Sequence, residues 1–410
     1  MKIKSIKARE ILDSRSNPTI EATMELENGI KAVASVPSGA STGSNEALEL
    51  RDNDERFHGK GVLKAVNNVN SIIAPKLIGK EINQLEIDQL LLELDSTKNK
   101  SNLGANAILV VSLLTLKCLA KLENKELYEY VSDGKYNMPI PMINIINGGA
   151  HADNNLDLQE FMIVPLLNDE HSRIRAASEV FITLKKMLKE DGLSTGVGDE
   201  GGFAPNLKNN EECFKYLVKA ITKSGYVPGK DIALAIDAAA SEFYNQKLNK
   251  YNLDGKELTV DELIEYYKYL VNEYPIISIE DPFYEQDLES LAKLTKDIGN
   301  QVMIVGDDHF VSQAEYLEKG IKLNAGNAIL LKANQVGSIT EFFETIKLAK
   351  ANGYKQIISH RSGETNDTFI ADLGVGLSLD YIKTGSVSRG ERICKYNRLM
   401  EIEDNLTREN

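Results

Sequence analysis

Short apolar runs that lead to an ionisable residue recur along the second half of the chain. The runs IALAI, IISI, VMIV, AILL and LSLDYI lead in turn to Asp237, Glu280, Asp307, Lys332 and Lys383. Such runs are typical of buried parallel strands, and their spacing of roughly 23 to 43 residues leaves room for a helix and two loops between strands. The pattern predicts a parallel βα barrel, in which residues at the carboxyl ends of the strands line one shared site.

A further run, in residues 357–369 (IISHRSGETNDTF), ends abruptly in polar residues that a buried strand does not need. The guanidinium of Arg361 matches the oxygens of a phosphate or a carboxylate, and the hydroxyl of Ser362 is a small donor beside it. His360 could hold or relay a proton. The alternative is a solvated turn after a buried strand.

The first half of the chain has a different pattern. Strand-like alternation extends from residue 2 to about residue 27, and a helical series then continues to about residue 131, with ANAILVVSLLTLKCLAKL predicted as a buried helix. Residues 132–142 (SDGKYNMPIPM) contain turn residues and two prolines. We therefore predict an N-terminal α+β cap domain over residues 1–131, a linker over 132–142, and a barrel that carries the active site over 143–410.

Composition and charge narrow the setting in which the protein works. The net charge of -14 argues against nucleic acid or an anionic membrane as the main partner. The N-terminal sequence MKIKSIKARE lacks the apolar segment of a secretory signal, and the apolar stretch 105–116 is too short to span a bilayer. The three cysteines are far apart and have no CxxC spacing, which is typical of a reducing compartment. We expect a cytoplasmic location.

The acids at the predicted strand ends indicate a metal. Asp237, Glu280 and Asp307 are hard oxygen donors, which favour Mg²⁺ or Mn²⁺ over Zn²⁺ or Cu²⁺. Buried carboxylates that cluster in this way repel one another unless a cation neutralises them. The alternative is that they pair with Lys332 and Lys383, although two lysines beside three acids still leave room for a dication.

Two glycine-rich segments add candidate chemistry. VPSGASTG, residues 36–43, offers backbone donors and hydroxyls that could fold over a phosphate or a second metal; the alternative is a simple linker. In GVGDEGGFAP, Glu200 stands among glycines, which suggests a positioned proton donor whose pKa is raised by neighbouring acids. Lys332, held neutral near a dication, could remove a proton next to a carboxylate while an acid on the opposite face helps a β-hydroxyl to leave. The reaction class is a metal-assisted dehydration.

These motifs resemble those of the enolase family of bacterial type, the phosphopyruvate hydratases of glycolysis. The match covers nearly the whole chain and runs from DSRSNPT at Asp13 through VPSGASTG, NGGAHADNN, LQEFM, GDEGGFAPN, SIEDPF, GDD, LLKANQ and SHRSGET to IKTGS at Ile382. The resemblance implies an N-terminal α+β cap and a TIM-like α/β barrel of the unusual order ββαα(βα)6.

The resemblance also implies interconversion of 2-phosphoglycerate and phosphoenolpyruvate with two magnesium ions; a lysine base acting with magnesium is already known for the enolase superfamily. The metal ligands that it implies are three acids and a loop serine, namely Asp237, Glu280, Asp307 and Ser41. The catalytic residues that it implies are a lysine base, an acid and two groups beside the acid, namely Lys332, Glu200, Glu160 and His360. The substrate-binding residues that it implies are Ser41, His151, Gln159, Arg361, Ser362 and Lys383.

The chain departs from the family's motifs at several positions. The family usually has glycine where this chain has Ser16, Ser96 and Val110, and these changes put the loop geometry of the cap in question, because a glycine at positive φ tolerates replacement poorly. A leucine commonly stands at the position of His309, which we expect to point outward. Glu401 replaces an arginine that in many relatives pairs with an acid across a subunit interface, so we expect a homodimer whose interface is rewired or is weaker at neutral pH.

Two other functions remain open. A different acid-sugar lyase or racemase on the same barrel would lack the phosphate-binding SHRSG segment and the loop that carries Ser41. A catalytically inactive enolase paralogue that acts as a binding or structural protein would be expected to have lost Lys332, Glu200 or a metal acid, and none of these is lost.

Overall fold

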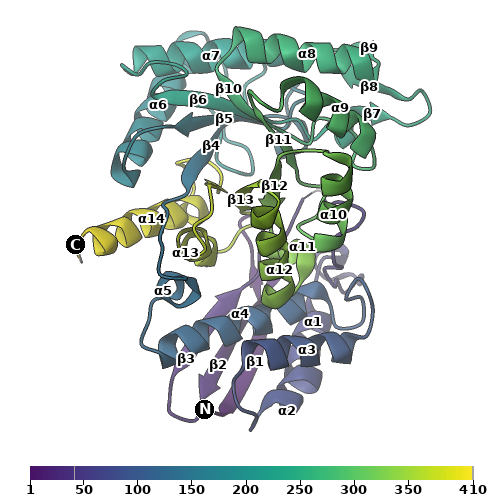
Figure 1. The fold of residues 1–410 in the computed structure, drawn as a ribbon, viewed down its shortest axis with the longest axis vertical. Coiled ribbons are helices and arrows are strands. Elements are labelled where there is room, and N and C mark those ends of the chain that lie inside the picture. The colour runs from purple at the N-terminus through teal and green to yellow at the C-terminus, as the bar shows by residue number, and fades with distance from the viewer. Residues whose placement is uncertain (41, 409–410) are drawn as a thin grey trace.

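A closed eight-stranded barrel and a smaller N-terminal domain make up the computed structural model, which describes residues 1–40 and 42–408 (Figure 1). The barrel strands, in chain order, are β4 (Ile140–Asn147), β5 (Glu160–Pro165), β6 (Ile232–Asp237), β10 (Ile276–Glu280), β11 (Met303–Gly306), β12 (Ala328–Leu331), β13 (Lys355–Ser359) and β14 (Tyr381–Lys383). Around the barrel the order is β10-β11-β12-β13-β14-β4-β5-β6. Only β5 runs antiparallel to its barrel neighbours in the described chain.

The order of helices confirms the predicted ββαα(βα)6 barrel. Strands β4 and β5 are followed by α6 (Glu170–Glu190) and α7 (Asn210–Lys223) before β6 begins. The remaining barrel helices are α8 (Val260–Glu273), α9 (Leu288–Ile298), α10 (Ala314–Leu323), α11 (Ala333–Val336), α12 (Ile339–Ala351), α13 (Phe369–Gly376) and α14 (Gly390–Arg408). A small antiparallel sheet of β7 (Tyr244–Asn245), β8 (Lys250–Leu253) and β9 (Lys256–Leu258) is inserted after β6.

Alternate residues of the strands point into the barrel and fill it. The interior cluster consists of buried aliphatic and methionine side chains, namely Met142, Met162, Val164, Ala233, Ala235, Val305, Ala328, Leu330 and Ile357. The intervening residues face the outer helices, whose apolar positions recur every three or four residues, as Leu291, Leu294 and Ile298 do in α9. The interior is therefore a packed core, and the barrel can bind a ligand only at its end.

The N-terminal domain is a three-stranded antiparallel sheet covered by helices. Its strands are β1 (Ile3–Leu12), β2 (Pro18–Leu26) and β3 (Lys31–Ser35), and its helices are α1 (Leu63–Asn68), α2 (Ala74–Leu77), α3 (Gln84–Asp95), α4 (Ala105–Leu122) and α5 (Leu127–Val131). Helix α4 packs on β2 and β3. By length and composition α4 could cross a membrane, but 78% of it is buried inside the protein, which is the pattern of a core helix. The predicted buried helix is confirmed.

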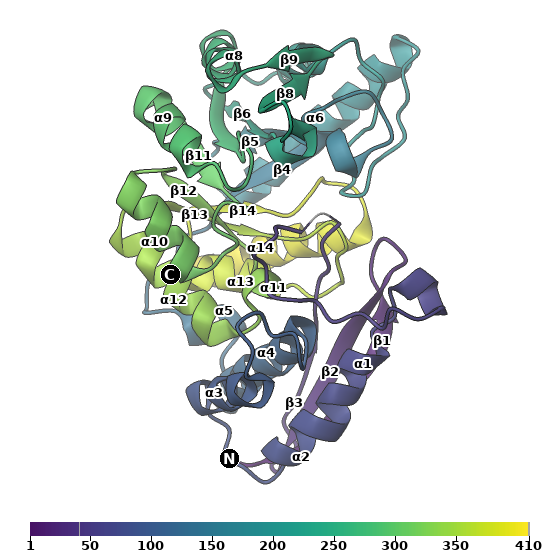
Figure 2. The same ribbon diagram turned by 90° about the vertical axis from the view of Figure 1, so that its right-hand side faces the viewer.

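The two domains meet at the loop that follows β13. Ser38 and Gly363 exchange two backbone hydrogen bonds of 2.7 and 2.8 Å, and the backbone N–H of Ser14 donates to the carbonyl of Glu364 over 2.8 Å. Figure 2 shows the strands of the N-terminal sheet rising toward the barrel from below. The N-terminal domain thus brings its loops to the carboxyl end of the barrel strands, which we call the barrel mouth.

Two of the serines that replace family glycines lie in the left-handed region of backbone conformation. Ser16 has φ 61° and Ser96 has φ 59°, and both are exposed. Ser96 ends helix α3 as its C-cap residue, a position where glycine carries no steric penalty. Val110 instead lies inside α4 and is fully buried, so it acts through packing rather than backbone conformation.

Replacing Ser96 by glycine should stabilise the protein. The left-handed conformation costs a residue with a Cβ roughly 1 to 2 kcal/mol, so Ser96→Gly should raise the free energy of unfolding by about 1 kcal/mol, measured by urea denaturation. Ser224 is a matched control because it also ends a helix but has φ -81°. Ser224→Gly should give no gain, and an equal gain from both changes would contradict the conformational explanation.

Candidate active site

The ionisable residues predicted at strand ends meet at the barrel mouth. Asp237, Glu280 and Lys383 are the last residues of β6, β10 and β14. The residues directly after β11, β12 and β13 are Asp307, Lys332 and His360. Because β5 runs in the opposite direction, its first residue, Glu160, reaches the same end, where it pairs in register with Asp237.

The predicted site residues that the structure describes line one pocket, apart from Glu280. Glu280 is 1% exposed and reaches the pocket only through its bonds to Lys383. Ser41, predicted to contact a second metal and the substrate, lies outside the described residues. The pocket lining also includes residues that the sequence analysis did not select, namely Ala40, Ala239, Ser241, Glu242, Asp281, Asp308 and Ser359.

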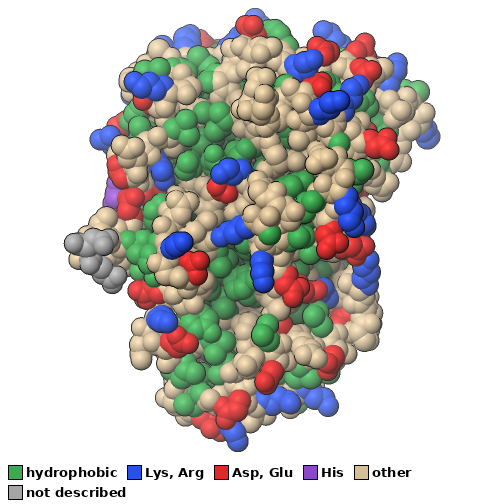
Figure 3. All heavy atoms as spheres, in the orientation of Figure 1, with side chains coloured by type: hydrophobic (Ala, Val, Ile, Leu, Met, Phe, Trp, Pro, Cys, Tyr) green, Lys and Arg blue, Asp and Glu red, His purple; other side chains and the backbone are tan. Residues whose placement is uncertain are grey.

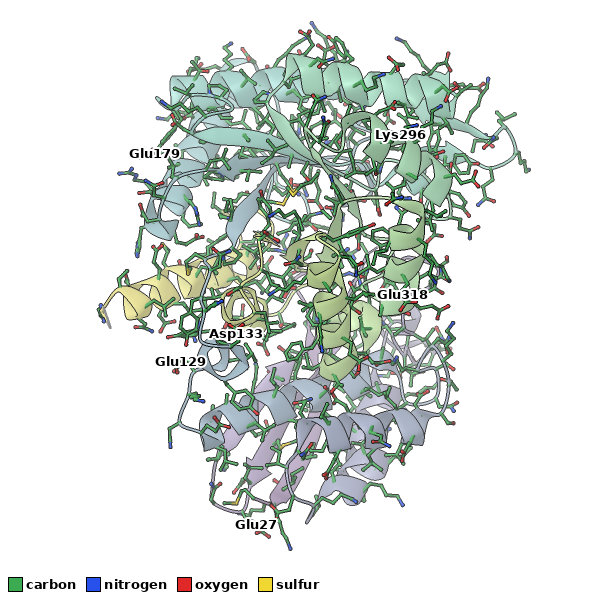
Figure 4. The ribbon with its side chains drawn as sticks, viewed as in Figure 1. Glu27, Glu129, Asp133, Glu179, Lys296 and Glu318 are labelled. Carbon is green, nitrogen blue, oxygen red and sulfur yellow. The ribbon has the colours of Figure 1, made fainter. Side chains whose placement is uncertain are left out.

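Charged groups at the mouth are buried, unlike those on the outer surface. On the face seen in Figure 3, acidic and basic side chains are interspersed, and Figure 4 shows Glu179 and Lys296 pointing away from the barrel. Inside the mouth, Asp237 is 3% exposed and Lys383 is 2% exposed. Water therefore screens the charges of the mouth far less than those of the surface.

Lys383 forms ion pairs with three acidic side chains at once. Its Nζ lies 2.8 Å from Glu280 Oε2, 3.2 Å from Asp237 Oδ2 and 3.2 Å from Glu160 Oε2. Burial alone would lower the pKa of Lys383, but the three carboxylates outweigh burial and hold that pKa well above its ordinary value. Lys383 therefore pairs with these acids, which is the alternative to a metal site that the sequence left open.

Lys332 forms an ion pair with Asp307 on the other side of the pocket. Its Nζ donates to Asp307 Oδ2, while Asp307 Oδ1 accepts a hydrogen bond of 2.9 Å from Gln335 Nε2. Burial lowers the pKa of Lys332, yet the charge of Asp307 outweighs burial and raises it above the ordinary value. Asp307 therefore favours the charged ammonium in this arrangement, and a Lys332 held neutral near a dication stays a prediction.

Glu160 and Glu200 form a pair of acids that two histidines contact, and one of these, His360, follows the strand next to that of Lys332. Strands β12 and β5, which deliver Lys332 and Glu160, are four positions apart in the eight-stranded barrel and so lie across it from each other. Glu200 Oε2 accepts a hydrogen bond of 3.0 Å from Asn144 Nδ2, and Glu200 Oε1 lies 3.5 Å from His151 Nδ1 and 3.4 Å from His360 Nε2. His151 Nδ1 also lies 3.5 Å from Glu160 Oε1.

The surroundings of the two acids shift their pKa values in opposite directions. Burial and the charge of Glu200 raise the pKa of Glu160 well above its ordinary value. Burial also acts to raise the pKa of Glu200, but His360, His151 and Arg392 outweigh it and hold that pKa well below its usual range. Burial lowers the pKa of His360 to about 3, and its Nε2 faces Glu200 Oε1 at 3.4 Å. The sequence analysis expected the raised pKa at Glu200, which is wrong.

Arg361 and Ser362 lie side by side beneath the N-terminal domain, as the sequence analysis placed them. The guanidinium of Arg361 pairs with the carboxylate of Glu46 through contacts of 2.9 and 3.1 Å, and Arg361 Nη1 also donates to Asn334 Oδ1 over 3.2 Å. Arg15 Nη1 donates to Ser362 Oγ over 3.4 Å. An anion that enters here meets two guanidinium groups and must displace Glu46 from one of them.

Both domains match models of known protein families, and these matches agree with the arrangement of the barrel mouth. Residues 3–131 match the family model described as the enolase N-terminal domain, and residues 135–410 match the one described as the enolase C-terminal TIM barrel domain. The chain belongs to the enolase family. Its two domains support an enzyme with lyase-type chemistry of the enolase superfamily.

Carboxylates that could hold a metal are present at this enolase-family mouth. Among the described residues, Asp281, Asp307 and Asp308 form one group whose ligand atoms lie within 4.8 Å of one another, and His151, Glu160 and Glu200 form a second. The predicted trio of Asp237, Glu280 and Asp307 is not one of these groups, since Lys383 bonds its first two members and Lys332 the third. The oxygen donors suit Mg²⁺, provided that the lysines give way.

His309 corrects an expectation and explains part of this cluster. It is 3% exposed, and its Nδ1 lies 2.9 Å from Asp281 Oδ1. The same carboxylate accepts backbone hydrogen bonds of 2.9 Å from Asp307 and from Asp308. His309 therefore points inward and not outward, because Asp281 offers it a buried acceptor. Sequence reasoning missed Asp281 and Asp308, although each stands next to a predicted ligand.

Removing the ammonium of Lys383 should destabilise the protein in a pH-dependent way. Lys383→Met leaves three buried carboxylates without their cation, which should cost about 3 to 5 kcal/mol of unfolding free energy at neutral pH. Glu160 and Glu280 already have raised pKa values, so the native state binds protons more tightly than the unfolded chain, and their contribution to stability falls as pH rises above the ordinary carboxyl pKa. The loss should therefore shrink as pH is lowered.

The control for this measurement is an exposed ion pair. Lys355 pairs with Asp380 at the surface over 2.7 Å, and Lys355→Met should cost about 1 kcal/mol or less. Added Mg²⁺ should partly restore the stability of Lys383→Met and not of Lys355→Met. A loss in Lys383→Met that is the same at every pH, with no response to Mg²⁺, would contradict the electrostatic account.

Proposed function

We propose that this enolase-family chain catalyses the reversible, magnesium-dependent dehydration of 2-phospho-D-glycerate to phosphoenolpyruvate. The observation that supports it most is the position of Lys332 and of the Glu160–Glu200 pair on opposite sides of one buried pocket. Loss of water from neighbouring carbons needs a base at one carbon and an acid at the hydroxyl of the other. This arrangement offers both, with the substrate between them.

Lys332 is the base that takes the C2 proton of the substrate. It must first become neutral, and its ion pair with Asp307 opposes that. If Asp307 held a cation, Lys332 would lose this partner, and burial with the positive charges nearby would then lower its pKa. Magnesium bound by Asp237, Glu280 and Asp307, with a second ion near Ser41, would supply positive charge against the charge that builds on the substrate carboxylate.

Glu200, with Glu160 behind it, delivers the proton to the leaving hydroxyl at C3. Between them the two carboxyls hold one proton; because the raised pKa of Glu160 favours it there, it must pass from Glu160 to Glu200 before Glu200 donates it. As the C3–O bond breaks, the electron pair leaves with oxygen, and the proton from the acid pair converts the departing hydroxide into water. The carboxylate that remains on Glu200 is stabilised by the N–H donor of Asn144.

The phosphate group is assigned to Arg361 and Ser362, with Arg15 beside them. His151 and Gln159 line the same pocket and are assigned to substrate contact.

We place the enzyme in the cytoplasm as a homodimer. The acid expected to face Glu401 across this interface is Glu21. Within the chain, Glu21 pairs with Arg9 over 2.6 Å and Glu401 with Arg398 over 2.8 Å, so each acid has a cation without the partner subunit.

The direct test follows the absorbance of phosphoenolpyruvate formed from 2-phosphoglycerate. The native chain should form product with Mg²⁺ and stop when a chelator is added. Lys332→Ala should lower kcat by about 10³-fold or more, because no other group described at the mouth replaces the base. Lys296→Ala, which removes an exposed lysine of α9, is the control and should keep native activity.

Absence of product would favour the alternative function, that of a catalytically inactive enolase paralogue. A native chain that is folded and binds Mg²⁺, yet forms no phosphoenolpyruvate, would indicate an inactive enolase paralogue with a binding or structural role. Activity that survives Lys332→Ala would contradict the assignment of the base.

A further inference from the structure

Arg392 lies wholly inside the protein and has no part in the function proposed so far. It is the third residue of α14, which starts beside the loops after β13 and β14 and runs outward to the C-terminal end of the chain (Figure 1). Its side chain is 0% exposed. A buried guanidinium is costly unless hydrogen-bonded on several sides, so its partners indicate what it is for.

The hydrogen-bond partners of Arg392 come from three segments: the loop after β13, the segment around Asp199, and Ser14, whose Oγ accepts from Nη2 over 3.4 Å. Nη1 donates to His360 Nδ1 and, over 2.7 Å, to the carbonyl of Arg361. Nη2 donates to the carbonyls of Ser362 and Asp199 over 2.6 and 3.2 Å. The stem is equally confined, because a Cβ on Gly385, which has φ +81°, would lie 2.8 Å from Arg392 Cδ.

The contact with His360 determines where the imidazole carries its proton. A guanidinium has only donors, so the Nδ1 that faces Arg392 must be an acceptor and cannot hold a hydrogen. The single proton of the neutral ring is then on Nε2, the atom that lies 3.4 Å from Glu200 Oε1. Nε2 is buried and makes no hydrogen bond in the described structure, and Glu200 Oε1 is the acceptor that it faces.

We propose that Arg392 is a positioning residue that holds His360 as the Nε2–H tautomer, so that His360 acts on Glu200 as a hydrogen-bond donor and not as a proton relay. This inference rests on the proposed function for its catalytic meaning. A proton on His360 Nδ1 would place two N–H donors, that of Nδ1 and that of Arg392 Nη1, face to face with no acceptor between them. The proton of the acid pair consequently has no route onto His360 and goes to the leaving hydroxyl.

The first test measures the tautomer itself, without any substrate. Long-range ¹H–¹⁵N spectra of the full-length protein with ¹⁵N-labelled histidine distinguish protonated from unprotonated ring nitrogens, and the His360→Asn variant identifies the signals of His360. We expect a protonated Nε2 and an unprotonated Nδ1, unchanged from about pH 6 to about pH 8. A protonated Nδ1, or an imidazolium in that range, would overturn the proposal.

The second test separates positioning from support of the phosphate-binding loop. Arg392→Met removes every donor and should let the Nδ1–H tautomer appear, with kcat lowered by about 10²-fold and KM changed by less than about 3-fold. Arg392→Lys keeps the charge and one donor, and should retain the tautomer and recover part of kcat. If Arg392→Met does not fold, the Arg392→Lys variant and the native spectra decide.

The matched control is Arg398→Met, on the same helix but outside the pocket, where Arg398 pairs with Asp372 over 2.7 Å. It should leave the His360 signals and kcat unchanged. Arg392 variants that raise KM while the tautomer and kcat stay native would reduce Arg392 to structural support and overturn the proposal. If the native chain forms no phosphoenolpyruvate, the proposed function fails, whereas the tautomer measurement still stands or falls by itself.

Discussion

The buried ammonium of Lys383 makes the barrel mouth possible. Parallel strands bring their carboxyl ends together, and in this chain Asp237 and Glu280 occupy two of these ends while Glu160 arrives from the reversed strand β5. Three carboxylates so close together and so far from water would repel one another by more than the fold could tolerate. Lys383 donates hydrogen bonds to Asp237 and Glu280 and lies within ion-pair distance of Glu160, so one ammonium stabilises all three acids.

A second ion pair joins the two domains across the substrate pocket. Glu46 of the N-terminal domain binds the guanidinium of Arg361, while Ser38 and Gly363 form backbone hydrogen bonds beside it. The anion site and the contact between domains therefore share one side chain. In the proposed function, a substrate phosphate that replaced Glu46 on Arg361 would free a carboxylate of the N-terminal domain and so link substrate binding to that domain.

The barrel and most of the pocket could be predicted because strand ends carry a readable pattern. Each apolar run is followed by a residue that the closed barrel must place at its mouth, whatever the details of packing. Arg392 could not be found in this way, because it lies in a helix rich in charged residues that looks solvated until the helix is docked. His309 was misplaced for a related reason: its acceptor, Asp281, comes from a different strand end.

Protonation states were less predictable than positions. The expected neutral Lys332 and protonated Glu200 depended on partners that spacing alone does not reveal, namely Asp307 beside the lysine and Asn144 and His360 beside the acid. These contacts shift the pKa values of Lys332 and Glu200, and the pKa values determine which group can act as base and which as acid. In the proposed function, a cation bound by Asp307 would remove the first of these contacts.

In the proposed mechanism, the base and the acid are separate groups on opposite sides of the pocket. Exchange of the C2 proton of 2-phosphoglycerate with deuterium from the solvent, followed by NMR with Mg²⁺ present, tests this most directly. Glu200→Gln should keep the exchange while phosphoenolpyruvate formation is lost, and Lys332→Ala should lose both. Exchange that persists in Lys332→Ala, or that disappears in a folded, Mg²⁺-binding Glu200→Gln variant, would contradict the account.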